Sequence, residues 1–330
     1  MKFCEKNPDG VGALKQLLSG KDINGNSGLS YLESQGYYYT SNPQEADLFI
    51  SMNGQFLPQF SLRRTILIIT EPYSRYSKMY SMKYKKLFGG FLGISSSSSV
   101  SDDEFYLGPQ DFSSIQEFQE KPEYTLAMVH QRYKKECRNL QGDIEREKAV
   151  SFFDNVFGDD FHTYGRVWDK TLPWNNLGWK GVLKGSIMGN DKLEKLRNYK
   201  FLICFENSRE DGYITEKIFS AFFSGAIPIY FGAPDISTHI PKECYLEFDG
   251  SDYDELYKRM KSITPSEFER IRNNIKTFLS STDGAKFTSI SLAKKLEFYF
   301  NRLKNVPHYP YSPQELWRKS RFILLKKFDI

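Results

Sequence analysis

A glutamate and a lysine stand in the first turn of a predicted helix. An apolar run over residues 200–205 is typical of a buried strand, an acidic loop fills residues 206–212, and a helical pattern begins at Ile214. The N-terminus of a helix offers free N–H groups and partial positive charge, so it binds phosphate well. Lys217 fits an anionic ligand there, and Glu216 suits hydrogen bonds from sugar or ribose hydroxyls. The alternative is a solvated first turn with a capping residue.

The surrounding elements predict where this turn lies. Gly225 fits the position just past a helix end, and residues 226–231 read as a second buried strand. Strand, loop, helix and strand form a βαβ unit, which implies a parallel sheet with ligands beyond the carboxyl ends of its strands. The residues that this arrangement places at a site are Glu206, Asn207, Ser208, Tyr213, Glu216 and Lys217.

A second candidate is the carboxylate of Glu71. It directly follows residues 65–70, a clear buried strand, and Pro72 prevents the strand from continuing. A carboxylate at the end of a parallel strand lies where α/β proteins build sites, and burial there would favour work as a general base. The alternative is a strand-end acid paired with an arginine, the candidates being Arg63, Arg64 and Arg75.

Four segments with fixed spacing carry a family resemblance. They are Phe205–Ser208, Tyr213–Lys217, Ile227–Ile229 and Gly232–Pro234. Their order resembles the signature of the α-1,3/1,4-fucosyltransferases, glycosyltransferase family 10. The resemblance is strongest over about 37 residues and weaker from about residue 65 to 250. It implies an α/β fold of the GT-B type, with two Rossmann-like domains facing each other across a cleft.

The resemblance also implies a reaction. An inverting enzyme would transfer L-fucose from GDP-fucose to a glycan hydroxyl, often the 3-OH of N-acetylglucosamine, without a metal or other cofactor. Glu71 matches the family's proposed base. Arg166, in a Tyr-Gly-Arg segment, matches an arginine that contacts the diphosphate, and Lys217 would stabilise the departing GDP. The residues that would orient ribose, fucose hydroxyls or phosphate are Asn207, Tyr213 and Glu216.

Further features leave alternatives open. Asn139 and Arg146 match another family spacing, but a structural salt bridge of Arg146 is the favoured interpretation. The Tyr- and Lys-rich residues 73–94 would line an acceptor cleft or form an ordinary amphipathic helix. Asp102-Asp103 and Asp252-Tyr253-Asp254 are interpreted as solvated loops rather than metal sites.

Two rival functions remain. One is a GT-B transferase that uses another nucleotide sugar, because a phosphate-binding helix does not select the base or the sugar. The other is a non-catalytic carbohydrate- or nucleotide-binding protein on the same fold. A dehydrogenase is disfavoured because no G-x-G-x-x-G follows a predicted strand, and a P-loop kinase because its motif is absent.

The length of 330 residues suggests two domains of ordinary size, and a tail follows them. We predict an acceptor-binding domain at 1–120, a GDP-sugar-binding domain at 123–300 and a basic, aromatic tail at 301–330. The net charge of +4 is too modest to indicate nucleic acid as a partner.

Location is predicted from the cysteines and the tail. The four cysteines are far apart, which suggests reduced thiols in a cytoplasmic protein and no zinc site. No apolar run is long enough for a membrane span. Residues 294–330, which include the tail, contain nine Lys or Arg, so the tail would pack on the protein or contact the inner membrane face peripherally.

Overall fold

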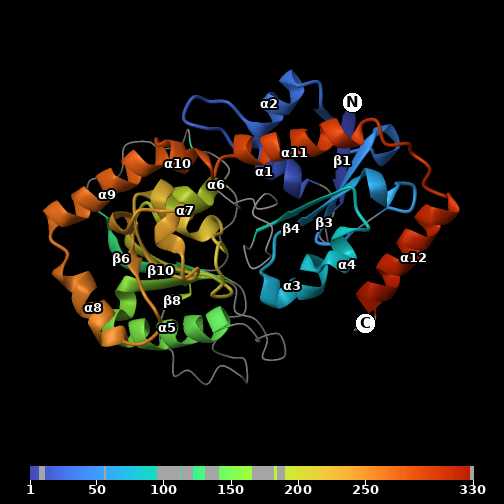
Figure 1. Ribbon diagram of the computed structural model, residues 1–330. Helices are drawn as coiled ribbons and strands as arrows, with labels where there is room; N and C mark the ends of the chain where they lie inside the picture. Colours follow the sequence, from blue (N-terminus) through green and yellow to red (C-terminus); the bar gives the residue numbers. More distant parts are fainter. Residues whose placement is uncertain are drawn as a thin grey trace. The chain divides into compact units, whose positions relative to one another are not determined.

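The computed structural model divides the chain into two compact units. It describes residues 1–6, 12–55, 57–94, 112, 122–130, 141–165, 182–183 and 190–327. The first unit contains residues 1–113 and 285–330, and the second contains residues 114–284 (Figure 1). Two α/β units agree with the fold class that the sequence predicts.

The first unit is built on a five-stranded parallel sheet in the order β2-β1-β3-β4-β5. Its strands are β1 (Lys2–Lys6), β2 (Tyr38–Tyr39), β3 (Leu48–Met52), β4 (Thr65–Ile69) and β5 (Gly90–Gly93). Its helices are α1 (Ala13–Ser19), α2 (Gly28–Ser34), α3 (Tyr73–Tyr80), α4 (Met82–Lys85), α11 (Ser289–Leu303) and α12 (Pro313–Lys327).

Helices cover both faces of this sheet. On one face, Leu67 and Ile69 of β4 share a buried cluster with Tyr84 of α4 and Phe322 of α12. On the other, the ring of Phe3 in β1 lies 5.0 Å from that of Phe300 in α11. A strand that is buried on both faces has a continuous run of apolar residues, and for this reason β4 can be predicted from residues 65–69 of the sequence.

The second unit is built on a six-stranded parallel sheet in the order β11-β10-β9-β6-β7-β8. Its strands are β6 (Tyr124–Val129), β7 (Phe161–Tyr164), β8 (Val182–Leu183), β9 (Tyr199–Phe205), β10 (Ile227–Phe231) and β11 (Leu246–Glu247). Its helices are α5 (Gln141–Phe157), α6 (Asn190–Leu196), α7 (Glu216–Ser224), α8 (Tyr253–Ser262) and α9 (Pro265–Leu279), and α10 (Thr282–Ala285) lies at its boundary.

The predicted βαβ unit is present as β9-α7-β10. The two strands pair in parallel from Phe201 opposite Ile227 to Phe205 opposite Phe231. Gly225 caps α7 with φ of +76°, a left-handed conformation that glycine adopts without penalty. The helix begins at Glu216 rather than at the predicted Ile214, because the preceding loop continues to the N-cap residue Thr215.

The predicted domain limits of 123–300 and 301–330 require correction. Helix α11 packs against α1 and α2, so residues 285–300 belong with the first unit. The predicted tail includes α12, which also packs on that unit. Leu62 N–H donates to Glu315 Oε2 over 3.0 Å, and the ammonium of Lys319 donates to the backbone oxygen of Pro58. A periodic helical pattern does not indicate which sheet its apolar face will cover.

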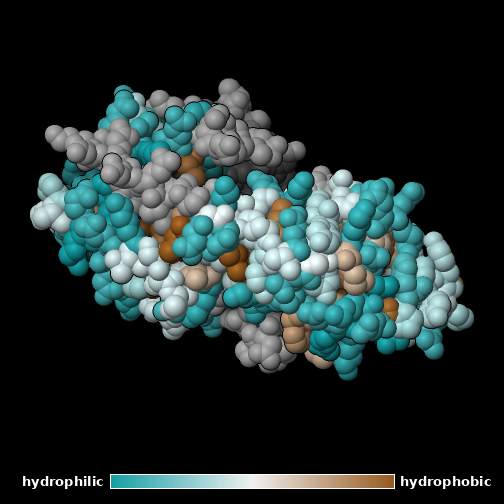
Figure 2. Space-filling view, turned by 90° about the horizontal axis from the view of Figure 1, so that it is seen from above, coloured by the Kyte–Doolittle hydropathy of each residue, from teal (hydrophilic) through white to brown (hydrophobic). Residues whose placement is uncertain are grey.

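The remaining global predictions concern thiols and the surface. Cys4, Cys204 and Cys244 are buried free thiols, and Cys137 lies outside the described residues. Within the described part of the chain, no helix has the length and apolar character of a membrane span. The face drawn in Figure 2 is largely hydrophilic, and its hydrophobic residues are scattered.

Candidate functional site

The loop between β9 and α7 gathers polar side chains at the carboxyl end of the second sheet. The strand ends at Phe205, and the polar residues that follow cannot continue its apolar pattern. Gly212 turns the loop with φ of +70°, and its N–H donates to Asp235 Oδ1 over 2.9 Å. The loop therefore returns the chain to the sheet at the point where α7 begins.

Glu206 is the fully buried centre of this loop. Its Oε1 accepts hydrogen bonds from Thr215 N at 2.7 Å and Thr215 Oγ1 at 2.9 Å. Its Oε2 accepts from Lys217 Nζ at 2.9 Å. A buried carboxylate is tolerated when it is paired and hydrogen-bonded, and both conditions hold here. Glu206 thus connects the end of β9 to the first turn of α7.

Lys217 carries a stable positive charge at the helix N-terminus. Burial alone would lower the pKa of Lys217, but the carboxylates of Glu206 and Glu216 outweigh burial and raise this pKa above its usual value. The side chain remains 13% exposed, and Nζ lies 3.6 Å from Glu216 Oε1. Lys217 can therefore offer its charge, together with that of the helix terminus, to an anion.

Glu216 is the more accessible carboxylate of the pair. Its side chain is 39% exposed, whereas that of Glu206 is buried. Burial would raise the pKa of Glu216, but the ammonium groups of Lys217 and Lys192 outweigh burial and lower it. An ionised, accessible carboxylate can accept hydrogen bonds from ligand hydroxyls.

Arg146 holds the other side of the loop from helix α5. It is 1% exposed, and its Nη1 pairs with Asp143 Oδ1 at 2.9 Å, which confirms the structural salt bridge. Its Nη2 also donates to Phe205 O at 2.7 Å and Asn207 Oδ1 at 2.8 Å. With its amide oxygen engaged by Arg146, Asn207 is held in one orientation.

Two glycines allow close packing around Glu206. A Cβ atom at Gly142 would lie 1.8 Å from the backbone oxygen of Glu206, and Gly142 N–H donates to Asn207 O over 3.0 Å. A Cβ atom at Gly232 would lie 2.7 Å from Glu206 Cγ. Gly232 belongs to the motif that carries the family resemblance. The close approach of Glu206 explains why a residue without a side chain stands at this position.

The predicted donor-binding residues divide by location. Asn207, Tyr213, Glu216 and Lys217 lie on one continuous loop and helix turn. Tyr213 is buried, and its N–H donates to Glu210 O over 3.1 Å. Arg166 lies outside the described residues.

Glu71 lies in the first unit, after β4 and before α3. Its Oε2 is 3.3 Å from Arg75 Nη1, so one of the arginine partners expected under the alternative interpretation is present. The Glu71 side chain is 26% exposed, and its backbone oxygen accepts from Tyr80 Oη over 2.9 Å. Ion pairing does not separate the catalytic from the structural interpretation, because the carboxylate stays accessible.

A feature beside Glu71 was not predicted from the sequence. Asn53, after β3, has φ of +50°, and its Oδ1 accepts from Thr70 N over 2.9 Å. Its Nδ2 donates to Thr70 Oγ1 over 2.8 Å. This amide locks the residue that precedes Glu71, and the Asn53-Gly54 pair after a buried strand was the available signal.

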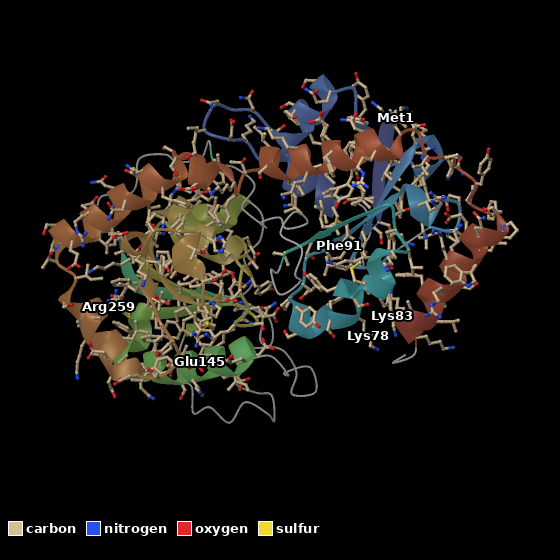
Figure 3. All side chains as sticks on the ribbon, viewed as in Figure 1. Met1, Lys78, Lys83, Phe91, Glu145 and Arg259 are labelled. Atoms are coloured by element: carbon tan, nitrogen blue, oxygen red, sulfur yellow. The ribbon has the colours of Figure 1, made fainter. Side chains whose placement is uncertain are left out.

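The Tyr- and Lys-rich stretch forms α3 and α4, followed by β5. Tyr80 and Tyr84 are buried, while Tyr73 is 40% exposed. Lys78 lies on α3 and Lys83 on α4, and both are labelled in Figure 3. An amphipathic pair of helices is thus present, and a role in acceptor binding stays a prediction.

The aspartates considered as metal ligands have other roles or lie outside the description. Asp252 Oδ1 accepts from Glu255 N over 2.9 Å and caps α8. Asp102 and Asp103 are not among the described residues. Of the side chains that are described, no three or more His, Cys, Asp or Glu form a group able to hold a metal ion.

Comparison with known proteins identifies part of the chain. Residues 137–270 match the family model described as glycosyltransferase family 10 (fucosyltransferase) C-term, which confirms the predicted resemblance over that region. An α-(1,3)-fucosyltransferase FucT of Helicobacter pylori is 33% identical over 126 residues, which are 37% of this chain and 26% of that protein. A GDP-fucose protein O-fucosyltransferase 3 of Danio rerio is 29% identical over 104 residues, 31% of this chain and 22% of that protein. The match thus spans about a quarter of each relative's length.

Solved structures extend the likeness to the whole fold. A crystal structure of α1,3-fucosyltransferase with GDP has a TM-score of 0.60 at 18% identity, covering 95% of this chain and 93% of that chain. The T4 phage BGT in complex with UDP and Mn²⁺ has a TM-score of 0.56 at 13% identity, covering 93% and 100%. These neighbours and the two parallel sheets confirm the predicted GT-B-type fold class.

Proposed function

Because residues 137–270 match family 10 fucosyltransferases, we propose that this protein transfers L-fucose from GDP-fucose to a hydroxyl of a glycan acceptor. One observation carries the proposal. Lys217, held by the buried Glu206 at the N-terminus of α7, presents a positive charge at the carboxyl end of a parallel sheet. A diphosphate is the part of GDP-fucose that such a terminus would bind.

Each residue that binds GDP-fucose would have a separate role. Lys217 and the N–H groups of α7 would bind the diphosphate, joined by Arg166. Glu216 would accept hydrogen bonds from ribose or fucose hydroxyls, because it is ionised and accessible. Asn207 would donate through Nδ2, since Arg146 occupies its Oδ1. Tyr213 would support the loop from its buried position.

The proposed reaction is a single displacement with inversion. Glu71 takes the proton of the acceptor hydroxyl, and the oxygen of that hydroxyl forms a bond to the anomeric carbon of fucose. The bond from that carbon to the phosphate oxygen breaks, and GDP leaves with the electron pair. Lys217 and the helix terminus stabilise the charge that develops on GDP, so we propose that no metal is required. Each such contact is typically worth a few kcal/mol, roughly a hundredfold in rate.

The acceptor is proposed as N-acetylglucosamine in a glycan, with transfer to its 3-OH, and the product would belong to glycan biosynthesis or protein glycosylation. The rival function is transfer of a different sugar on the same fold. It is a second candidate because the T4 phage BGT structure, which has the same fold, was solved with UDP, and because a helix terminus does not select the base.

We propose a cytoplasmic location with peripheral contact at the inner membrane face. Leu316, Trp317, Ile323 and Leu324 of α12 are about half exposed or more, although the opposite face of the helix is buried. Arg321 and Lys327 lie on the same helix, and basic residues beside apolar ones suit an anionic membrane surface. Sedimentation with anionic and with neutral vesicles tests this, and equal recovery with both would contradict it.

The central experiment is calorimetry in the presence of EDTA with GDP-fucose, GDP-mannose and UDP-galactose. We expect selective binding of GDP-fucose. Replacing both members of the buried pair, Glu206→Gln with Lys217→Met, removes the cation without stranding a carboxylate, and it should weaken binding about a hundredfold. Glu206→Gln alone keeps the ammonium and is the matched control. Preference for the uridine donor, or loss of all binding in EDTA, would overturn the proposal.

A further inference from the structure

A small recess lies between α6 and α7, at the carboxyl ends of β6 and β9. Val129 and Cys204 line it from the two strands, and Lys192, Glu216, Lys217 and Ser220 line it from the helices. Its volume is about 30 Å³. A space of that size admits a water-sized group, such as a single phosphate oxygen.

Lys192 is a second ammonium group directed to this recess. Its Nζ donates to Ser220 Oγ over 3.0 Å, and Ser220 Oγ in turn donates to Glu216 O over 2.9 Å. The Ser220 hydroxyl therefore uses its proton on the helix backbone and accepts from the lysine. This arrangement fixes the ammonium beside the first turn of α7.

The surroundings of Lys192 are unfavourable for an isolated cation. Burial, and to a smaller extent the neighbouring ammonium of Lys217, lower the pKa of Lys192, whereas Glu216 and Cys204 act in the opposite direction. The nearby Glu216 does not offset burial. An anion that enters the recess would therefore stabilise the charged form of Lys192.

We propose that Lys192 is a second phosphate-binding residue, which together with Lys217 holds the diphosphate of the nucleotide sugar. The inference rests on the proposed function and extends it to a residue of α6. The charges agree with it: the ammonium groups of Lys192 and Lys217 are balanced by Glu216 and by the Glu206 that pairs with Lys217, so the N-terminus of α7 adds partial positive charge at the recess. An entering phosphate oxygen would find donors on two helices.

A purely structural role makes a different prediction. In that case Lys192 only ties α6 to α7 through Ser220, and any side chain able to donate to the hydroxyl would serve. Lys192→Gln separates the two roles because it keeps a donor and removes the charge. Lys192→Arg keeps the charge, and Lys195→Gln is the matched control because Lys195 is exposed on the same helix.

The test is calorimetric binding of GDP, with guanosine measured by its competition against GDP, and thermal unfolding of each variant. We expect Lys192→Gln to weaken GDP binding about tenfold or more, to leave guanosine within about twofold, and to unfold within a few degrees of the wild type. Lys192→Arg should retain most of the affinity, and Lys195→Gln should match the wild type.

The inference would be overturned if Lys192→Gln bound GDP as tightly as the wild type does, or if the substitution weakened the binding of GDP and of guanosine equally. Either result would leave the proposed function intact. If the wild type binds no GDP, the proposed function fails and this inference fails with it.

Discussion

The two candidate sites are built in opposite ways. In the second unit, Glu206 is buried and accepts hydrogen bonds from both Thr215 and Lys217. In the first unit, Glu71 is partly exposed, and its ion pair with Arg75 is longer, at 3.3 Å. A buried network fixes a charge in place before any ligand arrives, whereas an exposed carboxylate can change its partner. The first arrangement suits binding of an anion, and the second suits a group that must take up and release a proton.

The largest expected effect comes from breaking the buried network. Glu206→Ala would leave Lys217 without its closest carboxylate and would remove the acceptor for Thr215 N–H. Removing one member of a buried ion pair typically costs about 3–5 kcal/mol, so we expect a loss of that size in the free energy of unfolding. Urea denaturation measures it.

The exposed Glu194 of α6 supplies the control for this experiment. Glu194→Ala should change stability by less than about 0.5 kcal/mol. If Glu206→Ala changed stability no more than this control, the contrast between a fixed and an adjustable carboxylate would be lost.

The second prediction concerns Glu71. Glu71→Gln keeps the shape of the side chain and removes its ability to accept a proton, so kcat for fucose transfer should fall about 10²- to 10⁴-fold. The affinity for GDP-fucose should stay within about twofold, because the donor-binding residues lie in the other unit. Single-turnover kinetics and calorimetry measure the two quantities. A proportional fall in donor affinity would instead make Glu71 a donor-binding residue.

The third prediction sharpens the idea that the network is fixed by close packing. Gly142→Ala would place a methyl group 1.8 Å from the backbone oxygen of Glu206, and neither backbone can yield easily. We expect a loss of about 1–3 kcal/mol in stability, as for other overpacked sites, and weaker GDP binding. The control is Ser151→Ala on the same helix, α5. Gly158→Ala would not serve, because Gly158 has φ of +53° and a side chain there would strain the backbone. Unchanged stability of Gly142→Ala would show that the loop can move.

Sequence reasoning recovers the local structure around both sites. The apolar runs and Gly225 predict β9, α7 and β10. These elements are set by period and by capping residues, which a single sequence displays. Their start points differ by one or two residues because loops and caps compete at helix ends.

Long-range contacts could not be predicted in the same way. Residues 289–300 were predicted to belong to the second domain, but α11 packs against α1 and α2 of the first unit. Lys192 stands in a polar stretch typical of a solvated helix, and only the fold brings it beside Ser220. For the same reason Glu206 was placed at the site without its partners, because the loop conformation brings Thr215 back to it.

The smallest expected effect concerns the partner of Glu71. Arg75 is 38% exposed, and pairs of this kind contribute at most about 1 kcal/mol, so Arg75→Ala should change stability by less than that. If Glu71 acts as the base, loss of the neighbouring cation makes its carboxylate easier to protonate, so the acidic limb of the kcat profile should move to higher pH. A structural pair predicts no movement of that limb. Arg63→Ala is the control, because Arg63 is also exposed and lies before β4, whereas the arginine that pairs with Glu71 is Arg75. Measuring kcat against pH for both variants therefore tests whether the exposed pair serves the reaction or only the surface.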